Sequence, residues 1–147
     1  MALRSIVTEG DELLRKKSRQ VTEINERICT LLDDLADTMY YENRGIGLAA
    51  VQVGVLRRVF VVDVGDEHGL IEFINPEIIE TSGNQVYCEG CLSVPGRNAN
   101  VNRPAKIKIR ATIDMEKSLS LKLKEFLPFV FVMNLITSKA YCLLIRP

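Results

Sequence analysis

An apolar stripe between residues 22 and 41 constrains the fold more than any other feature of the chain. Its apolar residues recur at spacings of three and four, which places them on one face of an α-helix. They are Ile24, Ile28, Leu31, Leu32, Leu35 and Met39. Thr22 can cap this helix, with Glu23 in the first turn, so the pattern predicts a helix from Thr22 to about Tyr41. We expect its apolar face to pack into the core.

Short strand-like segments follow the helix and are separated by turns. They lie at residues 55–63, 70–74, 77–81, 85–88 and 105–113. We expect loops at residues 43–54 and 94–104, an interruption at Asn75-Pro76, and a helical turn within residues 11–19. These elements predict an α+β fold in which short antiparallel strands pack around the long N-terminal helix.

Length and charge set broad limits on the function. The chain has 147 residues, which predicts a single domain over residues 1–147. Lys+Arg and Asp+Glu are both 19, so the formal net charge is zero, and nothing favours bulk binding to nucleic acid or to a membrane surface. There is no apolar signal segment and no run near the ~20 residues of a membrane span. We therefore expect a cytoplasmic protein.

Cys91 lies in the segment E-G-C-L-S at residues 89–93 and forms a C-x-x-C pair with Cys88. A structural zinc site needs a second such pair, which the chain lacks. A thioredoxin-like site needs a helix after the pair, whereas Pro95 and Gly96 predict a turn. Cys91 can therefore be a metal ligand, a nucleophile or a buried thiol.

Residues 45–52 read G-I-G-L-A-A-V-Q and contain the G-x-G-x-x-A form of a dinucleotide fingerprint. That fingerprint requires a preceding strand and a helix that opens within it, but here a long helix precedes and Gly54 follows closely. The small residues instead allow close approach of the backbone to a ligand or to another segment, with the Gln52 amide beside it. His68 is the only histidine, and its predicted turn, next to two acidic residues, favours a solvated side chain.

Together, residues 45–52 and 89–93 resemble the first two signature motifs of the peptide deformylases, and the resemblance spans residues 1 to about 121. It implies removal of the N-formyl group from formyl-methionine of new polypeptides. The implied partners are N-formylmethionyl peptides and ribosome-associated nascent chains. The implied cofactor is a divalent metal, Fe²⁺ or Zn²⁺, held by one cysteine and the two histidines of an H-E-x-x-H helix.

The resemblance also implies roles for individual residues of this chain. Cys91 matches the cysteine that binds the metal. Gln52 and the backbone N–H of Leu92 match the groups that stabilise the oxyanion. The backbone of Gly47 is implied to contact the formyl end. The residues implied to form the peptide groove are Gly45, Ile46, Gly47, Glu89 and Gly90.

The third deformylase motif is absent from the chain. No H-E-x-x-H exists, and residues 126–137 read F-L-P-F-V-F-V-M-N-L-I-T, where Pro128 would disturb a helix. One thiolate without imidazoles predicts weak or absent metal binding. Without the glutamate no proton shuttle remains, so we expect negligible deformylase activity.

The genetic code relates this segment to the missing motif. Codons GTN-ATG-AAY for residues 132–134, read from the third base, give NAT-GAA, which permits His followed by Glu. The same register permits Asp and His at residues 135–137. This compatibility predicts a frameshift near Lys122, with residues from about 122 to 147 forming an out-of-frame tail. The tail is apolar and could mediate self-association.

Two other interpretations stay open. The chain can be a catalytically dead relative with a genuine new tail that still binds peptides through residues 45–52 and 89–92. Alternatively, Cys91 can be the nucleophile of a thiol enzyme, which requires a nearby base.

Overall fold

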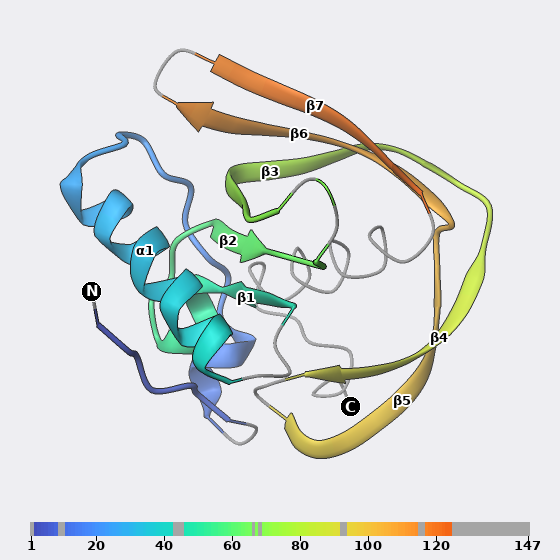
Figure 1. Ribbon diagram of the computed structural model, residues 1–147, viewed down its shortest axis with the longest axis horizontal. Helices are drawn as coiled ribbons and strands as arrows, with labels where there is room; N and C mark the ends of the chain where they lie inside the picture. The colour runs from blue at the N-terminus through green and yellow to red at the C-terminus, as the bar shows by residue number, and fades with distance from the viewer. Residues whose placement is uncertain are drawn as a thin grey trace.

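A computed structural model of the chain describes residues 2–8, 11–42, 46–65, 67, 69–91, 94–114 and 117–124. For residues 15, 87–91, 94–99, 101, 103, 112–114 and 117–124 it describes the backbone alone. Within these ranges the chain forms one α-helix, two short 3₁₀ helices and seven strands (Figure 1). The α+β fold of antiparallel strands around an N-terminal helix is confirmed. In the described part, no helix is both long enough and apolar enough to cross a lipid bilayer.

Helix α1 spans Glu26–Tyr41, so it begins four residues later than predicted. Asn25 has extended backbone and its side chain accepts a hydrogen bond from the Ile28 N–H at 3.2 Å, which makes Asn25 the N-cap in place of Thr22. The apolar stripe is buried as expected within the helix, whereas Ile24 precedes it and is only half-buried.

The main sheet has five strands in the order β1-β2-β3-β6-β7, with every neighbouring pair antiparallel. Their bounds are β1 Gly47–Ala49, β2 Val59–Val62, β3 Ile71–Ser82, β6 Lys106–Asp114 and β7 Lys117–Lys124. Helix α1 lies across the β1–β2 end of this sheet (Figure 1).

The β2 side chains are buried on both faces of the sheet. Val59 and Val61 pack in the cluster that contains the α1 stripe, and Phe60 and Val62 pack in the cluster on the opposite face. The Phe60 ring stacks on Phe73 of β3 with 4.8 Å between ring centroids. This two-sided burial makes β2 the centre of the core.

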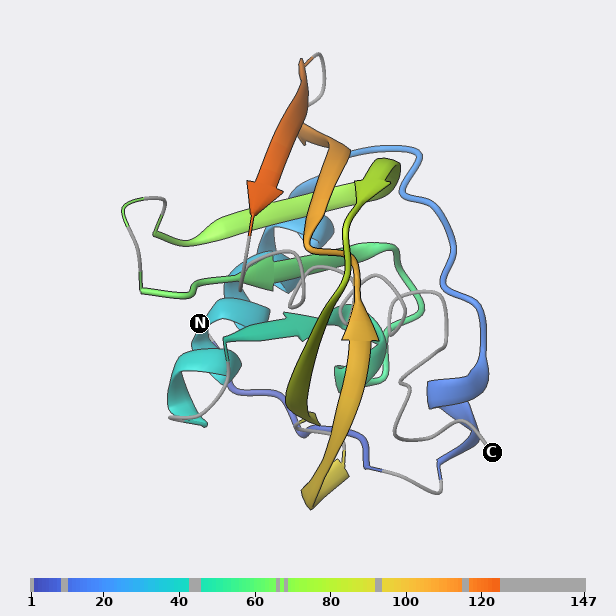
Figure 2. The same cartoon turned by 90° about the vertical axis from the view of Figure 1, so that its right-hand side faces the viewer.

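The expected break at Asn75-Pro76 is wrong as a strand boundary, because β3 continues through it. The irregularity takes the form of a register shift between Ile74 and Glu77, with Asn75 at a positive φ of 51°. The expected loop at residues 94–104 is also wrong. It forms β5 (Val94–Arg103), which pairs with β4 (Gln85–Cys91) in a separate two-stranded sheet (Figure 2). Pro and Gly are tolerated there because both strands are edge strands.

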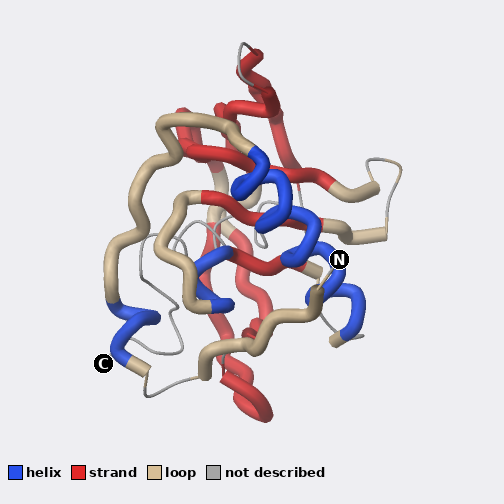
Figure 3. Tube along the Cα trace, turned by 90° about the vertical axis from the view of Figure 1, so that its left-hand side faces the viewer, coloured by secondary structure: helices blue, strands red, loops and turns tan. Residues whose placement is uncertain are grey.

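The N-terminal region runs along one side of α1 and the sheet (Figure 3). Its helical turn is shorter than predicted: η1 covers Glu12–Arg15 and is capped by the Asp11 side chain. Arg19 is already extended and forms a parallel bridge with Arg57. The segment from residue 125 onward, which includes most of the predicted out-of-frame tail, lies outside the described residues.

Candidate active site

The first motif is a short strand followed by a tight turn, where a plain loop was expected. Strand β1 leads into the 3₁₀ helix η2 (Ala50–Val53), which ends at Gly54 with a left-handed φ of 85°. Ala49 and Ala50 are fully buried, and Leu48 packs in the cluster of α1. Strand β1 pairs with β2, and the two small residues Ala49 and Ala50 pack in the clusters on opposite faces of the sheet.

Gln52 is held on both its side chain and its backbone. Its side chain is almost fully buried, at 2% exposure, and Oε1 accepts a hydrogen bond from the Ala49 N–H at 3.0 Å. The Gln52 backbone carbonyl accepts from the Val7 N–H at 2.7 Å. The Ala49 N–H thus engages the acceptor atom of the amide, and Nε2 is its donor atom. The arrangement suits donation of a hydrogen bond to an oxygen that develops negative charge.

Of the predicted peptide-binding residues of the first motif, Gly47 opens β1 and Ile46 directly precedes it. Gly47 pairs with Val62, and Ile46 accepts a hydrogen bond from the Asp63 N–H at 3.0 Å. Among the strands that the structure describes, β1 lies at the edge of the five-stranded sheet. Gly45 lies outside the described residues.

The second motif lies at the end of β4. Glu89 pairs with Ala99, Gly90 with Asn98 and Cys91 with Val94, and the register shifts between Gly90 and Cys91. The partner of Cys91 lies four positions before the partner of Gly90, so the pairing is irregular where β4 ends. The C-terminal end of β4 lies on the β1 side of the molecule, away from the β6–β7 hairpin (Figures 1 and 2). Leu92 and His68 lie outside the described residues.

A hydrogen-bonded Tyr40–Asp63 pair lies beside Ile46. The Tyr40 hydroxyl donates to Asp63 Oδ2 at 2.6 Å, and this bond, with smaller effects of burial and of the Asp63 charge, raises the pKa of Tyr40 to about 12. The same bond, together with the Gly65 N–H, lowers the pKa of Asp63. The pair links the last turn of α1 to the residue that follows β2.

Sequence reasoning missed the residues that support Gln52 and Ile46. Val7 contributes through its backbone N–H, which carries no signal in a side-chain pattern. Tyr40 and Asp63 are 23 positions apart. A polar contact over that separation is created by the fold and not by local spacing.

The comparison with known families decides the identity of this arrangement. A model of the polypeptide deformylase family matches residues 3–134. The chain belongs to the peptide deformylase family. This is a family of hydrolases, and the match extends beyond residue 121, where the two-motif resemblance ends.

Peptide deformylases of several bacteria are similar to this chain over most of its length. The peptide deformylase of Acetivibrio thermocellus is 54% identical over 127 residues, which are 86% of this chain and 73% of the relative. That of Alkaliphilus metalliredigens is 52% identical over 127 residues, covering 86% and 84%. The crystal structure of the Thermotoga maritima deformylase superposes with a TM-score of 0.92 at 32% identity and full coverage of both chains. The Legionella pneumophila enzyme gives 0.90 at 36% identity, covering 96% and 83%.

The donor set of this deformylase does not fit a tightly held catalytic metal. A protein site for Zn²⁺ or a similar ion takes three or four ligands, mostly imidazole and thiolate. The whole chain has one histidine, His68, and the second motif supplies one cysteine, Cys91. Among the described residues, no group of three His, Cys, Asp or Glu side chains could hold a metal ion.

Proposed function

We propose that this chain is a peptide deformylase with a retained peptide groove and oxyanion side but an incomplete metal site. The observation that carries the proposal is the setting of Gln52, which is buried and fixed at both its carbonyl and its amide oxygen. A fixed donor in a site from which water is excluded stabilises a developing oxyanion without reorganisation. The backbone N–H of Leu92 is proposed as the second donor and Cys91 as a metal ligand.

The proposed ligand is an N-formylmethionyl peptide, of the kind that begins new polypeptides in the cytoplasm. Strand β1 supports this proposal because it is an edge strand, and an extended peptide can add to such an edge through backbone hydrogen bonds. Gly45, Ile46 and Gly47 would contact the peptide from this edge. Glu89 and Gly90 of β4 would line the other side of the groove.

We further propose that the missing ligands were lost through a frameshift near Lys122. Codons compatible with His-Glu and a second His in the shifted register support this. Sequencing the gene across codons 120 to 147 tests it directly. Codons that cannot give H-E-x-x-H in the shifted register would refute the frameshift, and the tail would then be translated in its correct frame.

A paired assay tests the function. The chain as it stands and a frame-corrected chain are compared for bound Fe²⁺ or Zn²⁺ and for turnover of a formyl-methionyl peptide. We expect metal and turnover only in the corrected chain. Stoichiometric metal with normal turnover in the present chain would refute the proposal of an incomplete site.

Matched variants test the role of Gln52. In the frame-corrected chain, Gln52→Ala should lower turnover by about a hundredfold or more, the usual cost of losing one oxyanion donor. Gln20→Ala, at an exposed position, is the control and should leave turnover unchanged. Equal turnover in both variants would remove Gln52 from the reaction.

The second candidate is a catalytically dead peptide-binding relative. It is favoured by the coexistence of two intact motifs with a single histidine in the chain. Formyl-methionyl peptide that binds the present chain without being cleaved, together with a gene that encodes no H-E-x-x-H in any frame, would select this candidate.

A further inference from the structure

A groove of about 500 Å³ lies between the start of α1, the N-terminal segment and the backbone at residues 55–57. None of its lining residues belongs to the two motifs, so it is separate from the candidate active site. Its volume is in the range of pockets that hold small ligands.

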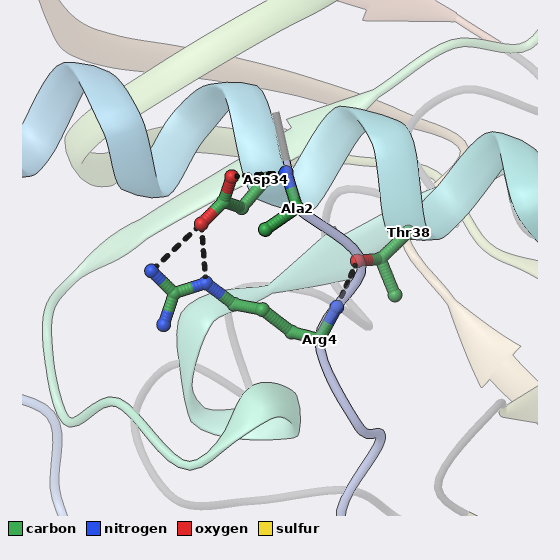
Figure 4. A network of polar contacts seen from close by, with 4 residues as sticks. All are labelled: Ala2, Arg4, Asp34 and Thr38. Carbon is green, nitrogen blue, oxygen red and sulfur yellow. Dashed lines mark hydrogen bonds and ion pairs between the residues drawn. The ribbon is translucent and has the colours of Figure 1, made fainter.

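The groove carries uncompensated positive charge. Arg4, Arg27 and Arg57 line it, with Glu26 as the single acidic lining residue. The Arg4 guanidinium is neutralised by Asp34 (Figure 4). Among the described residues, the Arg27 and Arg57 guanidinium groups form no hydrogen bond or ion pair. The groove is therefore lined by two unpaired guanidinium charges and by one carboxylate, that of Glu26.

The backbone that bears Arg57 is rigidly fixed. The Arg57 N–H donates to the Val55 carbonyl at 3.0 Å, and the Val55 N–H donates to Ala50 at 3.0 Å. The bridge with Arg19 adds a bond from the Arg19 N–H to Leu56 at 3.1 Å. A fixed backbone lowers the entropy that a ligand must overcome to engage the side chain. It also brings the backbone of a further exposed arginine next to the groove.

The remaining lining is largely apolar. Ile28 and Leu31 are buried residues of α1, and Val55 is half-buried on the facing segment. A guanidinium group binds a phosphate or carboxylate through paired N–H donors, and it is more weakly hydrated than an ammonium group. A cationic side next to an apolar side matches a ligand that has both characters.

We propose that this groove binds a small organic anion. Its phosphate or carboxylate group contacts the Arg27 and Arg57 guanidinium groups, and its apolar body packs against Ile28, Leu31 and Val55. The site is independent of the deformylase reaction, so it is expected in the chain as it stands.

Titration of the full chain with simple probes tests the site, with backbone amide NMR shifts as the readout. The probes are phenyl phosphate, benzoate, inorganic phosphate and phenol. We expect saturable shifts at residues 26–31 and 55–57 with one or both aromatic anions, the tighter of which identifies the head group. Inorganic phosphate and phenol, which carry only half of the ligand, should each bind at least about tenfold more weakly. Absence of saturable shifts with both aromatic anions would overturn the proposal.

Charge variants provide an independent check. Arg57→Gln and Arg27→Gln should each weaken binding of the tighter anion about tenfold, the usual scale of a charge-assisted contact. Glu26→Gln should strengthen it, because it removes the one acidic lining residue. Arg110→Gln, exposed on β6, is the matched control and should have no effect. Equal weakening by the Arg110 and Arg57 variants, with unchanged thermal unfolding, would mean that the anion does not bind in this groove.

Discussion

Arg4 and Asp34 form an ion pair across 30 positions that fixes the N-terminal segment to α1. Arg4 Nη2 and Nε lie 2.8 Å and 2.9 Å from Asp34 Oδ2, and the Ala2 N–H donates to Oδ1 at 3.1 Å (Figure 4). The Arg4 N–H donates to Thr38 Oγ1 at 3.0 Å. The Asp34 side chain is only 5% exposed, so the segment satisfies a carboxylate that would otherwise be buried without partners. The same segment continues to Val7, which bonds Gln52.

Asp34→Asn should lower the free energy of unfolding by about 2 kcal/mol, because it places an amide N–H₂ among donors and leaves Arg4 without its counter-charge. The cost stays below that of a fully buried pair because Arg4 is 33% exposed and can be solvated. Urea unfolding at pH 7 measures it. Glu67→Gln, in an exposed turn, is the control and should change stability by less than about 0.5 kcal/mol. Equal stabilities would show that the ion pair contributes nothing.

Tyr40→Phe should lower stability by about 1 kcal/mol at neutral pH through loss of the hydrogen bond to Asp63. Asp63 has a lowered pKa, so the stabilisation that depends on its ionised carboxylate is lost as the pH falls through 3.8 and below. Tyr40 has a raised pKa, so the stabilisation that depends on its protonated hydroxyl is lost as the pH rises from about 10 to about 12. The stability difference between the parent and the variant should therefore be constant between these limits and shrink on both sides. A difference that does not change from pH 3 to pH 11 would contradict the pairing.

The side chain of Asn75 connects β3 to the N-terminal segment, and its backbone adopts a positive φ. Its Oδ1 accepts from the Val21 N–H at 2.8 Å, and its Nδ2 donates to the Val21 carbonyl at 2.7 Å. Asn75→Gly should cost about 2 kcal/mol, one for each lost bond. Asn75→Ala should cost about 1 kcal/mol more, because alanine is strained at the positive φ of 51°. Chemical unfolding of both variants measures the order, and an alanine variant as stable as the glycine variant would contradict it.

The fold destabilises the charged form of the Glu72 side chain. Burial, and secondarily the charge of Asp33, raise the pKa of Glu72. The stability that this group contributes is present below its unfolded pKa of 4.5 and is lost as the pH rises through the folded pKa. Glu72→Gln should therefore raise the free energy of unfolding at pH 7 and have little effect at pH 3. A variant that is less stable than the parent at pH 7 would contradict this sign.

Local pattern predicted the elements in which burial follows a regular period. The α1 stripe and the alternation of β6, with Ile107 and Ile109 buried and Arg110 exposed, agree with the structure. Predictions from local pattern were wrong where pairing between residues far apart in the sequence determines the structure. Residues 94–104 have loop-like composition, but residues 94–103 form β5 and pair with β4. Asn75 stays within a strand because Val21 satisfies its side chain. The start of α1 was misplaced because both Thr22 and Asn25 are good caps, and only the backbone path selects between them.

The sequence by itself determined the family, through two motifs in order, and it determined the shortage of metal ligands, because one histidine cannot supply two imidazoles in any fold. Only the tertiary structure decided how Gln52 is held, which carboxylate Arg4 neutralises, and where Arg27 and Arg57 remain uncompensated. A formal charge of zero says nothing about where charges lie, because charge balance is a sum over the chain. Pairing and burial depend on distances between residues far apart in the sequence.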